Sequence, residues 1–521
     1  MLPDFGARGL PLRQGVALCG FMGVGKTTVG RAVAQLLGAD FVDLDEVVVA
    51  RHGSIASQLE RDGEGVFRAR ESVTLEWVLS HGPCVLATGG GSVADEHNRA
   101  LLHSWGFTAT LHAPLETLGL RPGVASRPLW GAARTLWAER QAAYADADLH
   151  VDATAAPEAV AQRIVCAVNR GLVRIRGSQP VVVDPGPLGA DAEMAVRVVG
   201  GARDVFAVTD ARVAGKFGAR AAESLEVRAL SVVPPGERHK NLRSYDRVVN
   251  DWLTGGVHRK AVALAIGGGS VTDLGGFVAA TILRGIPWVA WPTTLLAMVD
   301  ASVGGKTGLD HRGAKNVVGA FHAPRLSWSS LPTLSSLHPR KIRAGLAEVV
   351  KVALVTDAAL FETLEAAAPA LAKGDYRALP AVVARAVTAK MSVVDKDPFE
   401  QGGRICLNAG HTVAHVIEAA SKFAVPHGEA VAMGLVCELR WAAARGMVTT
   451  EDLNRVVRLL IALRLPVAPP RFDRTALRSA LVLDKKGSGD TVVVPVPVGI
   501  GAWSPVSLAW SSAETLIASL Q

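Results

Sequence analysis

A glycine-rich segment near the start of the chain has the residue types of a phosphate-binding loop. Residues 20–27, GFMGVGKT, fit the pattern G-x-x-x-x-G-K-[ST]. The apolar run VALC precedes them, and Val29, Val33 and Leu36 follow at helical spacing, which predicts a strand, a loop and a helix. In such a loop backbone N–H groups and the helix dipole bind phosphates, a lysine reaches the terminal phosphates, and a hydroxyl can bind Mg²⁺. The segment therefore predicts an ATP and Mg²⁺ site, to which we assign these residues: Gly23, Gly25, Lys26, Thr27 and Thr28.

Two carboxylates follow the next strand-like run. Asp43 and Asp45 in FVDLD occupy alternate positions, so both can point the same way and serve a metal ion or substrate hydroxyls. From these residues alone, a solvated strand end stays an open alternative.

A third group of residues could bind a metal ion. His411 and His415 are four apart and share a helix face, as in zinc sites, but the glutamate of H-E-x-x-H is missing. With Glu348 and His427 the set contains imidazoles and a carboxylate, which can hold zinc and leave positions open for substrate oxygens. Such ligands also accept Co²⁺. The glycine triplet 267–269, after the run AVALAI, is weak evidence for a dinucleotide site on its own.

The elements that position these residues alternate between strand-like and helical patterns. We predict an α/β fold: a P-loop domain with a parallel sheet over residues 1–172, a linker over 173–181, an α/β domain with the glycine triplet over 182–338, and a mainly helical domain with the candidate metal ligands over 339–521.

Composition excludes several classes of protein. The 521 residues are 49% hydrophobic, without the ~20 unbroken apolar residues of a membrane span or an apolar signal segment at the start. Five scattered cysteines do not form a disulfide framework, so we expect a cytoplasmic protein. The net charge of +7 suits anionic substrates, and no aromatic-basic stripe predicts nucleic-acid binding.

Residues 10–170 resemble shikimate kinase in the phosphate loop, the D-x-D pair, GE-x-x-F-R (63–68), the GGG turn (89–91), Arg127-Pro-Leu and Arg140-x-x-x-Tyr144. The resemblance implies that Asp43 lies near Mg²⁺, that Arg127 closes over the transferring phosphate, and that Arg121 flanks the nucleotide. Asp45 would accept the hydroxyl proton, and Arg140 would bind the shikimate carboxylate. The residues implied to hold shikimate are Asp45, Arg68, Gly90 and Arg140. Between Arg127 and Arg140 the chain is several residues shorter than we expect for this family.

Residues 180 to about 500 resemble 3-dehydroquinate synthase. The resemblance makes Glu348, His411 and His427 the zinc ligands, and places His415 on the substrate side. It implies a substrate site lined by Asp300, Lys306, Lys315, Asn316, Lys351, Lys390, Glu400, Arg404, Asn408 and Lys485 or Lys486. In that set Lys306 and Asn316 would hold the phosphate end. It implies an NAD site of Glu237, Lys240, Gly268, Gly269, Asp273, Thr293 and Thr294, with NAD used catalytically and not consumed. Arg284 would reach the phosphate of a neighbouring subunit, so a homodimer through this half is expected.

Together these resemblances predict one chain with two enzymes of aromatic-precursor biosynthesis. Alternatives are a gluconate-type kinase, a cyclase for another sugar phosphate, a polyol dehydrogenase, and a catalytically weak or regulatory kinase half. A nucleic-acid binder that uses the phosphate loop as a switch is the alternative outside enzymes.

Overall fold

The computed structural model describes residues 14–125, 127–201, 204–312, 314–470 and 491–509. The described residues fall into two compact units. The N-terminal unit contains the residues up to 173 together with 189–199, and the C-terminal unit contains 174–188 and the residues from 200 onward. Residues 173–181, which we predicted as a linker, include the short strand β6 (Val173–Ile175) and the first residue of β7 (Val181–Asp184).

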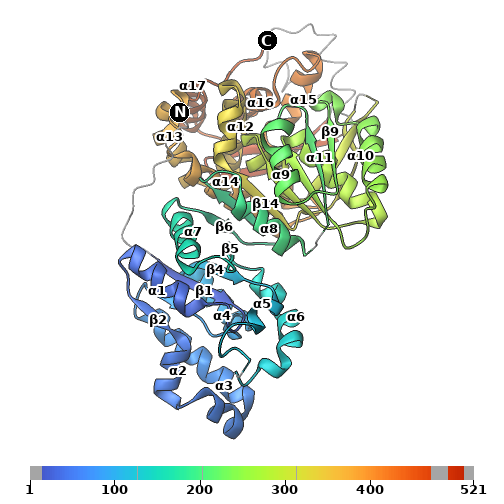
Figure 1. Cartoon of the computed structure of the whole chain (residues 1–521). Helices are drawn as coiled ribbons and strands as arrows, with labels where there is room; N and C mark the ends of the chain where they lie inside the picture. The colour runs from blue at the N-terminus through green and yellow to red at the C-terminus, as the bar shows by residue number, and fades with distance from the viewer. Residues whose placement is uncertain (1–13, 126, 202–203, 313, 471–490, 510–521) are drawn as a thin grey trace. The chain divides into compact units, whose positions relative to one another are not determined.

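The N-terminal unit is built on a five-stranded parallel sheet with the order β2-β3-β1-β4-β5. Its strands are β1 (Gly15–Gly20), β2 (Phe41–Asp43), β3 (Val85–Ala87), β4 (Gly106–His112) and β5 (Leu149–Asp152). Every residue of β1 is buried, as its apolar run predicts. Parallel strands end at one edge, so the segments after β1, β2 and β3 meet there (Figure 1). The helices are α1 (Lys26–Leu37), α2 (Leu44–His52), α3 (Ile55–Ser80), α4 (Glu96–Trp105), α5 (Leu115–Gly119), α6 (Ala133–Tyr144) and α7 (Pro157–Asn169).

The C-terminal unit begins with a seven-stranded sheet of order β6-β7-β14-β11-β10-β8-β9. Strands β7, β14, β11, β10, β8 and β9 run parallel. The remaining strands of this sheet are β8 (Val205–Asp210), β9 (Ala229–Val233), β10 (Val262–Gly267), β11 (Trp288–Pro292) and β14 (Leu326–Ser330). Helices α9 (Ala219–Ser224), α10 (Leu242–Thr254) and α11 (Gly269–Thr281) connect them, and α8 (Ala190–Gly200) lies largely in the N-terminal unit. An antiparallel hairpin of β12 (Lys306–His311) and β13 (Ala314–Phe321) follows β11.

From Pro339 the chain is mainly helical, as the sequence predicts. The helices are α12 (Pro339–Thr356), α13 (Ala358–Ala372), α14 (Leu379–Lys396), α15 (His411–Ala420), α16 (His427–Ala443) and α17 (Thr450–Ala462). Helix α12 is buried continuously from Ala344 to Val355, so it forms the centre of this part. The sequence analysis did not predict the closing antiparallel hairpin β15 (Thr491–Gly499) and β16 (Ala502–Ala509). Pro495 lies opposite Pro505 there, which an isolated two-stranded ladder tolerates although prolines usually argue against strands.

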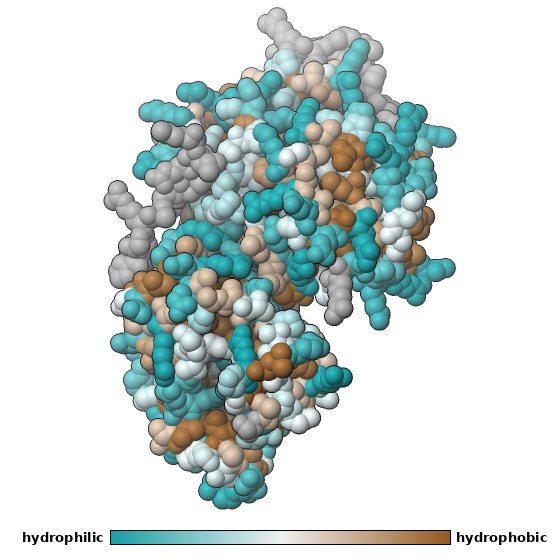
Figure 2. Space-filling view, in the orientation of Figure 1, coloured by the Kyte–Doolittle hydropathy of each residue, from teal (hydrophilic) through white to brown (hydrophobic). Residues whose placement is uncertain are grey.

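Among the described residues, no helix combines the length and apolarity needed to cross a membrane. On the face in view, hydrophobic residues form small separate patches among hydrophilic ones (Figure 2).

Candidate active sites

The phosphate loop has the backbone shape that its glycines predict. Gly23 and Gly25 have φ values of 78° and 103°, a left-handed conformation that favours glycine. The buried Lys26 Nζ donates to the carbonyl oxygens of Gly20 at 2.9 Å and Phe21 at 3.2 Å. Burial lowers the pKa of Lys26. The lysine side chain therefore folds back onto the loop. Phosphate oxygens of a bound nucleotide would replace the two carbonyl oxygens as its hydrogen-bond acceptors.

An oxygen pair of the kind that Mg²⁺ prefers lies beside the loop. Thr27 Oγ1, in the first turn of α1, donates to Asp43 Oδ2 at 2.6 Å. Asp43 caps α2, because its Oδ1 accepts the backbone N–H of Asp45 at 3.0 Å. This cap fixes the carboxylate that faces Thr27, so the structure brings together the two residues predicted to bind the metal ion.

A cluster of charged side chains of both signs lies around the GGG turn after β3. Arg140 Nη1 and Tyr144 Oη, both on α6, donate to the carbonyl oxygen of Gly90 at 3.1 and 2.6 Å. A Cβ on Gly91 would lie 2.6 Å from the guanidinium of Arg68, and one on Gly89 would lie 3.1 Å from Asp45 Oδ1. The turn therefore brings together the residues predicted to hold shikimate, and larger side chains in place of its glycines would displace them.

Glu71 holds Arg68 in this cluster and was missed by the sequence analysis. Its Oε2 accepts from Arg68 Nη1 at 2.9 Å, and its Oε1 accepts from Ser92 Oγ at 2.8 Å. The spacing of three residues on one helix was the available signal. Burial raises the pKa of Asp45, while Lys26 acts in the opposite direction. The exposed Arg127 also contributes its positive charge at Lys26 and Asp45.

A hollow of about 150 Å³ lies beside the phosphate loop. Its lining includes Gly25, Thr28, Arg121, Ala153 and Pro157. Arg121 Nη1 donates to the carbonyl oxygen of Gly23 at 3.0 Å, and its Nη2 donates to that of Ala153 at 2.7 Å. Ala153 and Pro157 carry no sequence signal for binding, because an apolar side chain that lines a cavity is of the same type as one that only packs in the core.

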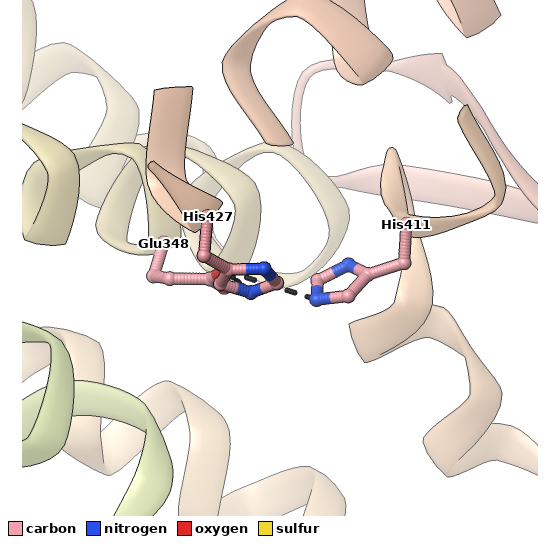
Figure 3. A group of neighbouring side chains, drawn as sticks. All are labelled: Glu348, His411 and His427. Atoms are coloured by element: carbon pink, nitrogen blue, oxygen red, sulfur yellow. Dashed lines mark ion pairs between the residues drawn. The ribbon is translucent and has the colours of Figure 1, made fainter. Parts of the chain in front are cut away.

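In the C-terminal unit, three side chains from three helices converge on one point (Figure 3). Glu348 lies on α12, whereas His411 and His427 are the first residues of α15 and α16. Their potential ligand atoms all lie within 4.8 Å of one another. His427 Nε2 is 3.3 Å and His411 Nε2 is 3.8 Å from Glu348 Oε1. Glu348 is fully buried, with Lys351 Nζ 2.5 Å from its Oε2 and both histidines facing its Oε1. A divalent cation fits between this carboxylate and the two imidazole rings.

The electrostatics of the two histidines also fit a cation. Burial lowers the pKa of His411 to about 3, which leaves the neutral imidazole that binds metals. Burial alone would lower the pKa of His427, but hydrogen bonding to Glu348 and Glu418 raises it to about 10. The carboxylates thus stabilise a positive charge at this position, which a bound cation would supply in place of the proton.

Glu418 is a second functional candidate that the sequence analysis missed. Its Oε2 lies 3.3 Å from His427 Nδ1, and its Oε1 accepts from Lys315 Nζ at 2.9 Å. Glu418 lies seven residues after His411 on α15, but only packing of α15 against α16 brings it to His427. Lys315, a predicted substrate residue, therefore forms an ion pair with Glu418.

The predicted substrate residues form a cluster of buried charges next to this triad. Lys390 Nζ donates to Asp300 Oδ1 at 2.6 Å, and Lys351 Nζ lies 3.8 Å from the same oxygen. Burial would raise the pKa of Asp300, but the two lysines hold it well below its usual range. Burial, together with Lys351, lowers the pKa of Lys390.

Four further predicted residues lie around the segment 397–408. Lys306 forms an ion pair with Glu400, which also accepts from Asn408 Nδ2 at 2.8 Å. Arg404 Nη2 donates to the carbonyl oxygen of Gly304 at 2.7 Å. The ring of His415 lies edge-on to that of His411 with centroids 5.6 Å apart.

The predicted NAD residues surround the carboxyl end of β10. Gly268 caps α11, and a Cβ there would lie 3.0 Å from Thr294 Cγ2. Thr293 Oγ1 is buried and lacks a hydrogen-bond partner among the described residues. The buried Lys240 Nζ lies 2.9 Å from Asp273, 2.7 Å from Glu237 and 2.6 Å from Asn316 Oδ1. These contacts raise the pKa of Lys240 above its usual range against the effect of burial.

We expected Asn316 beside Lys306 on a phosphate, but the structure places Asn316 with Lys240 and Lys306 with Glu400. Arg284 is exposed and has a positive φ of 68°. Lys485, with the neighbouring Lys486, lies outside the described residues.

Comparisons with protein families match both parts of the chain. Residues 22–169 match the shikimate kinase family model. Residues 230–344 match the N-terminal model of 3-dehydroquinate synthase, and residues 345–487 match its C-terminal model.

Similar proteins support the second match at greater length. A 3-dehydroquinate synthase from Pelobacter propionicus is 42% identical over 288 residues, which are 55% of this chain and 80% of the relative. One from Xanthomonas axonopodis pv. citri is 39% identical over 345 residues, 63% of this chain and 92% of the relative.

Two solved structures resemble the C-terminal unit. ValA, a 2-epi-5-epi-valiolone synthase from Streptomyces hygroscopicus subsp. jinggangensis with NAD⁺ and Zn²⁺ bound, is 32% identical with a TM-score of 0.59, covering 66% of this chain and 97% of ValA. A 2-deoxy-scyllo-inosose synthase, 22% identical with a TM-score of 0.58 over 67% of this chain and 98% of that one, shares the fold. The chain belongs to the 3-dehydroquinate synthase family and carries a shikimate kinase domain in front of it, which makes it a bifunctional kinase and lyase of the shikimate pathway.

Proposed function

We propose that the N-terminal unit transfers the terminal phosphate of ATP to the 3-hydroxyl of shikimate. The observation that supports this best is the convergence of Asp45, Arg68 and Arg140 on the GGG turn beside the phosphate loop. A planar guanidinium binds a carboxylate in a bidentate way, so Arg68 and Arg140 suit an acidic acceptor. A gluconate-type kinase shares the loop but does not explain these residues together.

The residues of the chain divide the chemistry between them. Asp45 accepts the proton of the attacking hydroxyl, and the raised pKa makes its carboxylate a better base than an exposed aspartate. Lys26 and Arg127 bring positive charge to the transferring phosphate. Mg²⁺, held by Thr27 and Asp43, supplies charge neutralisation on the phosphates.

The test follows ADP formation by the full chain with MgATP, with and without shikimate. Shikimate-dependent ADP that disappears in Lys26→Ala is expected. Equal ADP formation with and without shikimate would contradict the proposal and favour the alternative of a weak or regulatory kinase half.

We propose that the C-terminal unit converts 3-deoxy-D-arabino-heptulosonate 7-phosphate to 3-dehydroquinate and phosphate. The observation that supports this best is the triad Glu348, His411 and His427 beside the buried cluster of Asp300, Lys351 and Lys390.

In this proposal, the triad holds Zn²⁺ or Co²⁺, and NAD binds at the carboxyl end of β10 next to Gly268, Lys240 and Asp273. The metal supplies a Lewis acid for substrate oxygens, and NAD supplies a reversible hydride acceptor. Lys390 is suited to move protons, because burial lowers its pKa. Arg404 and Lys306 supply positive charge for the substrate's carboxylate and phosphate groups.

A second candidate is cyclisation of a different sugar phosphate, which the likeness to ValA favours. The reactions can be separated by the substrate carboxylate. We expect phosphate release from the heptulosonate phosphate and little from an analogue with a hydroxymethyl group in place of that carboxylate, and the reverse preference would select the second candidate.

The same assay tests the cofactor role. Phosphate release should continue through many turnovers per bound NAD without net rise in NADH absorbance. Accumulation of NADH would favour a polyol dehydrogenase instead.

We further propose that the protein is a cytoplasmic homodimer in which Arg284 reaches the neighbouring subunit's substrate. The exposure of Arg284 in a strained turn supports this placement. Mixed dimers of Arg284→Ala with His411→Ala should regain synthase activity, because one of the two sites would then have every functional residue. No recovery on mixing would contradict the shared site.

A further inference from the structure

A glutamine near the start of the C-terminal unit contacts the turn at residues 302–304, which lies between the predicted substrate residues Asp300 and Lys306. Gln179 lies between β6 and β7 and is 1% exposed. Its Nε2 donates to the carbonyl oxygen of Ser302, and its Oε1 accepts the backbone N–H of Gly304 at 2.7 Å. One amide group thus satisfies a donor and an acceptor of the same turn.

That turn connects two predicted substrate residues. It follows Asp300, whose side chain and carbonyl oxygen both accept from Lys390 Nζ, and precedes Lys306 at the start of β12. Gly304 and Gly305 have φ values of 105° and 69°, so the turn has a conformation that local sequence preferences do not stabilise without glycine. Contacts from outside the turn must therefore hold its orientation.

Gln179 and Arg404 hold the same residue from opposite ends of its backbone. The N–H of Gly304 donates to Gln179, while its carbonyl oxygen accepts from Arg404 Nη2 at 2.7 Å. A Cβ on Gly304 would lie 2.5 Å from that Arg404 nitrogen. A shift of this glycine would therefore move the guanidinium that the proposed function assigns to the substrate.

The neighbouring residue attaches the same segment to α14. Ser178 Oγ donates to Asp395 Oδ1 at 2.6 Å, and its N–H donates to the same oxygen at 3.1 Å. Asp395 lies on the helix that carries Lys390. Residues 178–179 thus contact both elements that form the Lys390–Asp300 pair.

We propose that Gln179 is a positioning residue for the synthase reaction, because it sets the turn that orients Asp300, Lys306 and Arg404. This inference rests on the proposed function of the C-terminal unit for its kinetic consequence. The orientation of the turn itself does not depend on which sugar phosphate binds.

The test uses the full chain with Gln179→Met, which keeps the length of the side chain and removes both hydrogen bonds. Loss of a buried hydrogen bond of this kind predicts a rise in KM for the heptulosonate phosphate of about tenfold, with a smaller change in kcat. Hydrogen exchange of the peptide that contains residues 302–305 should accelerate, because the N–H of Gly304 loses its acceptor. The kinase activity of the same chain should stay unchanged.

Ser330→Ala is the matched control. Ser330 Oγ donates to the carbonyl oxygen of Gly186 at 2.7 Å, a buried bond between β14 and the stretch just after β7 that does not involve the turn. This variant should leave the KM and the exchange of residues 302–305 as in the parent chain. If the Met variant does not fold, Gln179→Glu is measured instead, since it keeps the acceptor for Gly304 and loses only the donor to Ser302.

An unchanged KM together with unchanged exchange at residues 302–305 would overturn the inference. A fall in thermal stability and in kcat at constant KM would also overturn it, since Gln179 would then have only a structural role. Absence of synthase turnover in the parent chain would instead contradict the proposed function, and the exchange measurement would then decide the role of Gln179 alone.

Discussion

At the scale of single residues, the synthase site depends on buried charges that balance one another. Negative and positive side chains alternate in a row there. Lys351 Nζ lies 2.5 Å from Glu348 and 3.8 Å from Asp300, and Lys390 Nζ lies 2.6 Å from Asp300. Removal of one partner from such a buried pair typically costs about 3–5 kcal/mol, because the other charge stays buried and uncompensated. Substitutions at the edge of this cluster are therefore more informative than deletions at its centre.

Glu418 offers such a substitution. Glu418→Gln keeps the size of the side chain but removes the negative charge beside His427 Nδ1, so the imidazole becomes a weaker ligand. We expect zinc affinity to fall by about ten- to a hundredfold, as for other residues that orient metal-binding histidines. Competition with a chromophoric chelator measures the affinity directly. The control is Glu365→Gln. Glu365 Oε2 lies 2.6 Å from Arg455 Nη2, and this ion pair does not involve the triad. Equal zinc affinity in the parent chain and Glu418→Gln would contradict the assigned role.

At the scale of elements, the metal site exists because helices approach one another through glycines. Gly428 follows the ligand His427, and a Cβ there would lie 1.8 Å from the carbonyl oxygen of Ala344 on α12. A Cβ on Gly434 of α16 would lie 2.1 Å from the carbonyl oxygen of Gly410, which caps α15. These contacts set the spacing between the three helices that carry the ligands.

Gly428→Ala tests this spacing. The new methyl group must push the start of α16 away from α12, which separates His427 from Glu348. Zinc binding and synthase activity should be lost, while shikimate-dependent ADP formation persists. Gly215→Ala is the control in the same unit, because a Cβ at Gly215 meets nothing within 4 Å. Normal zinc affinity in Gly428→Ala would show that the helices can separate without moving the ligands.

A buried carboxyl group links α16 to the start of α15 and makes stability depend on pH. Glu438 Oε2 accepts the N–H of Gly410 at 2.7 Å, and burial raises the pKa of Glu438 from 4.5 to about 8. Between these values the folded protein keeps a proton that the unfolded chain releases, so the free energy of unfolding falls as pH rises through this window.

Glu438→Gln should remove this dependence, because the amide still offers an acceptor to Gly410 but does not titrate. The melting temperature of the variant relative to the parent chain should therefore be higher near pH 8 than near pH 4.5. Thermal unfolding followed by calorimetry at both pH values provides the measurement. A constant difference between the two proteins across the window would contradict a raised pKa for Glu438.

At the scale of the whole molecule, two separate units carry two unrelated ligand sets. The N-terminal unit offers hydroxyl and carboxylate oxygens at Thr27 and Asp43, whereas the C-terminal unit offers imidazole nitrogens and a carboxylate. Oxygen ligands suit Mg²⁺, and imidazoles suit Zn²⁺ or Co²⁺. The two activities should therefore respond to different metals.

We expect chelation followed by desalting to abolish both activities. Added Mg²⁺ should restore shikimate-dependent ADP formation alone, and added Zn²⁺ should restore phosphate release from the heptulosonate phosphate. His411→Ala should keep the first response and lose the second. Recovery of both activities with Mg²⁺ alone would contradict the assignment of the triad.

The sequence by itself determined the motifs whose function is local. The phosphate loop with Lys26 and Thr27 forms within one strand–loop–helix segment, so its spacing along the chain carries its geometry. The α/β order of the first two parts and the helical part from Pro339 also followed from periodicity, because helices and strands impose different spacings on apolar residues.

The tertiary structure alone decided which distant side chains meet. Spacing alone placed only His411 and His415 on one helix face, and Glu348 and His427 entered the predicted ligand set through the resemblance; the packing of α12, α15 and α16 is what brings Glu348, His411 and His427 together. Glu418 and Gln179 were invisible as functional residues, since a polar residue on a helix or in a connecting segment gains its role only from its partner. Glu71 had only its helical spacing from Arg68 to indicate a role. The physical reason is that contacts between residues far apart in the chain arise when helices and strands bury their apolar faces against one another. That packing depends on many residues together, so no single motif in the sequence indicates it.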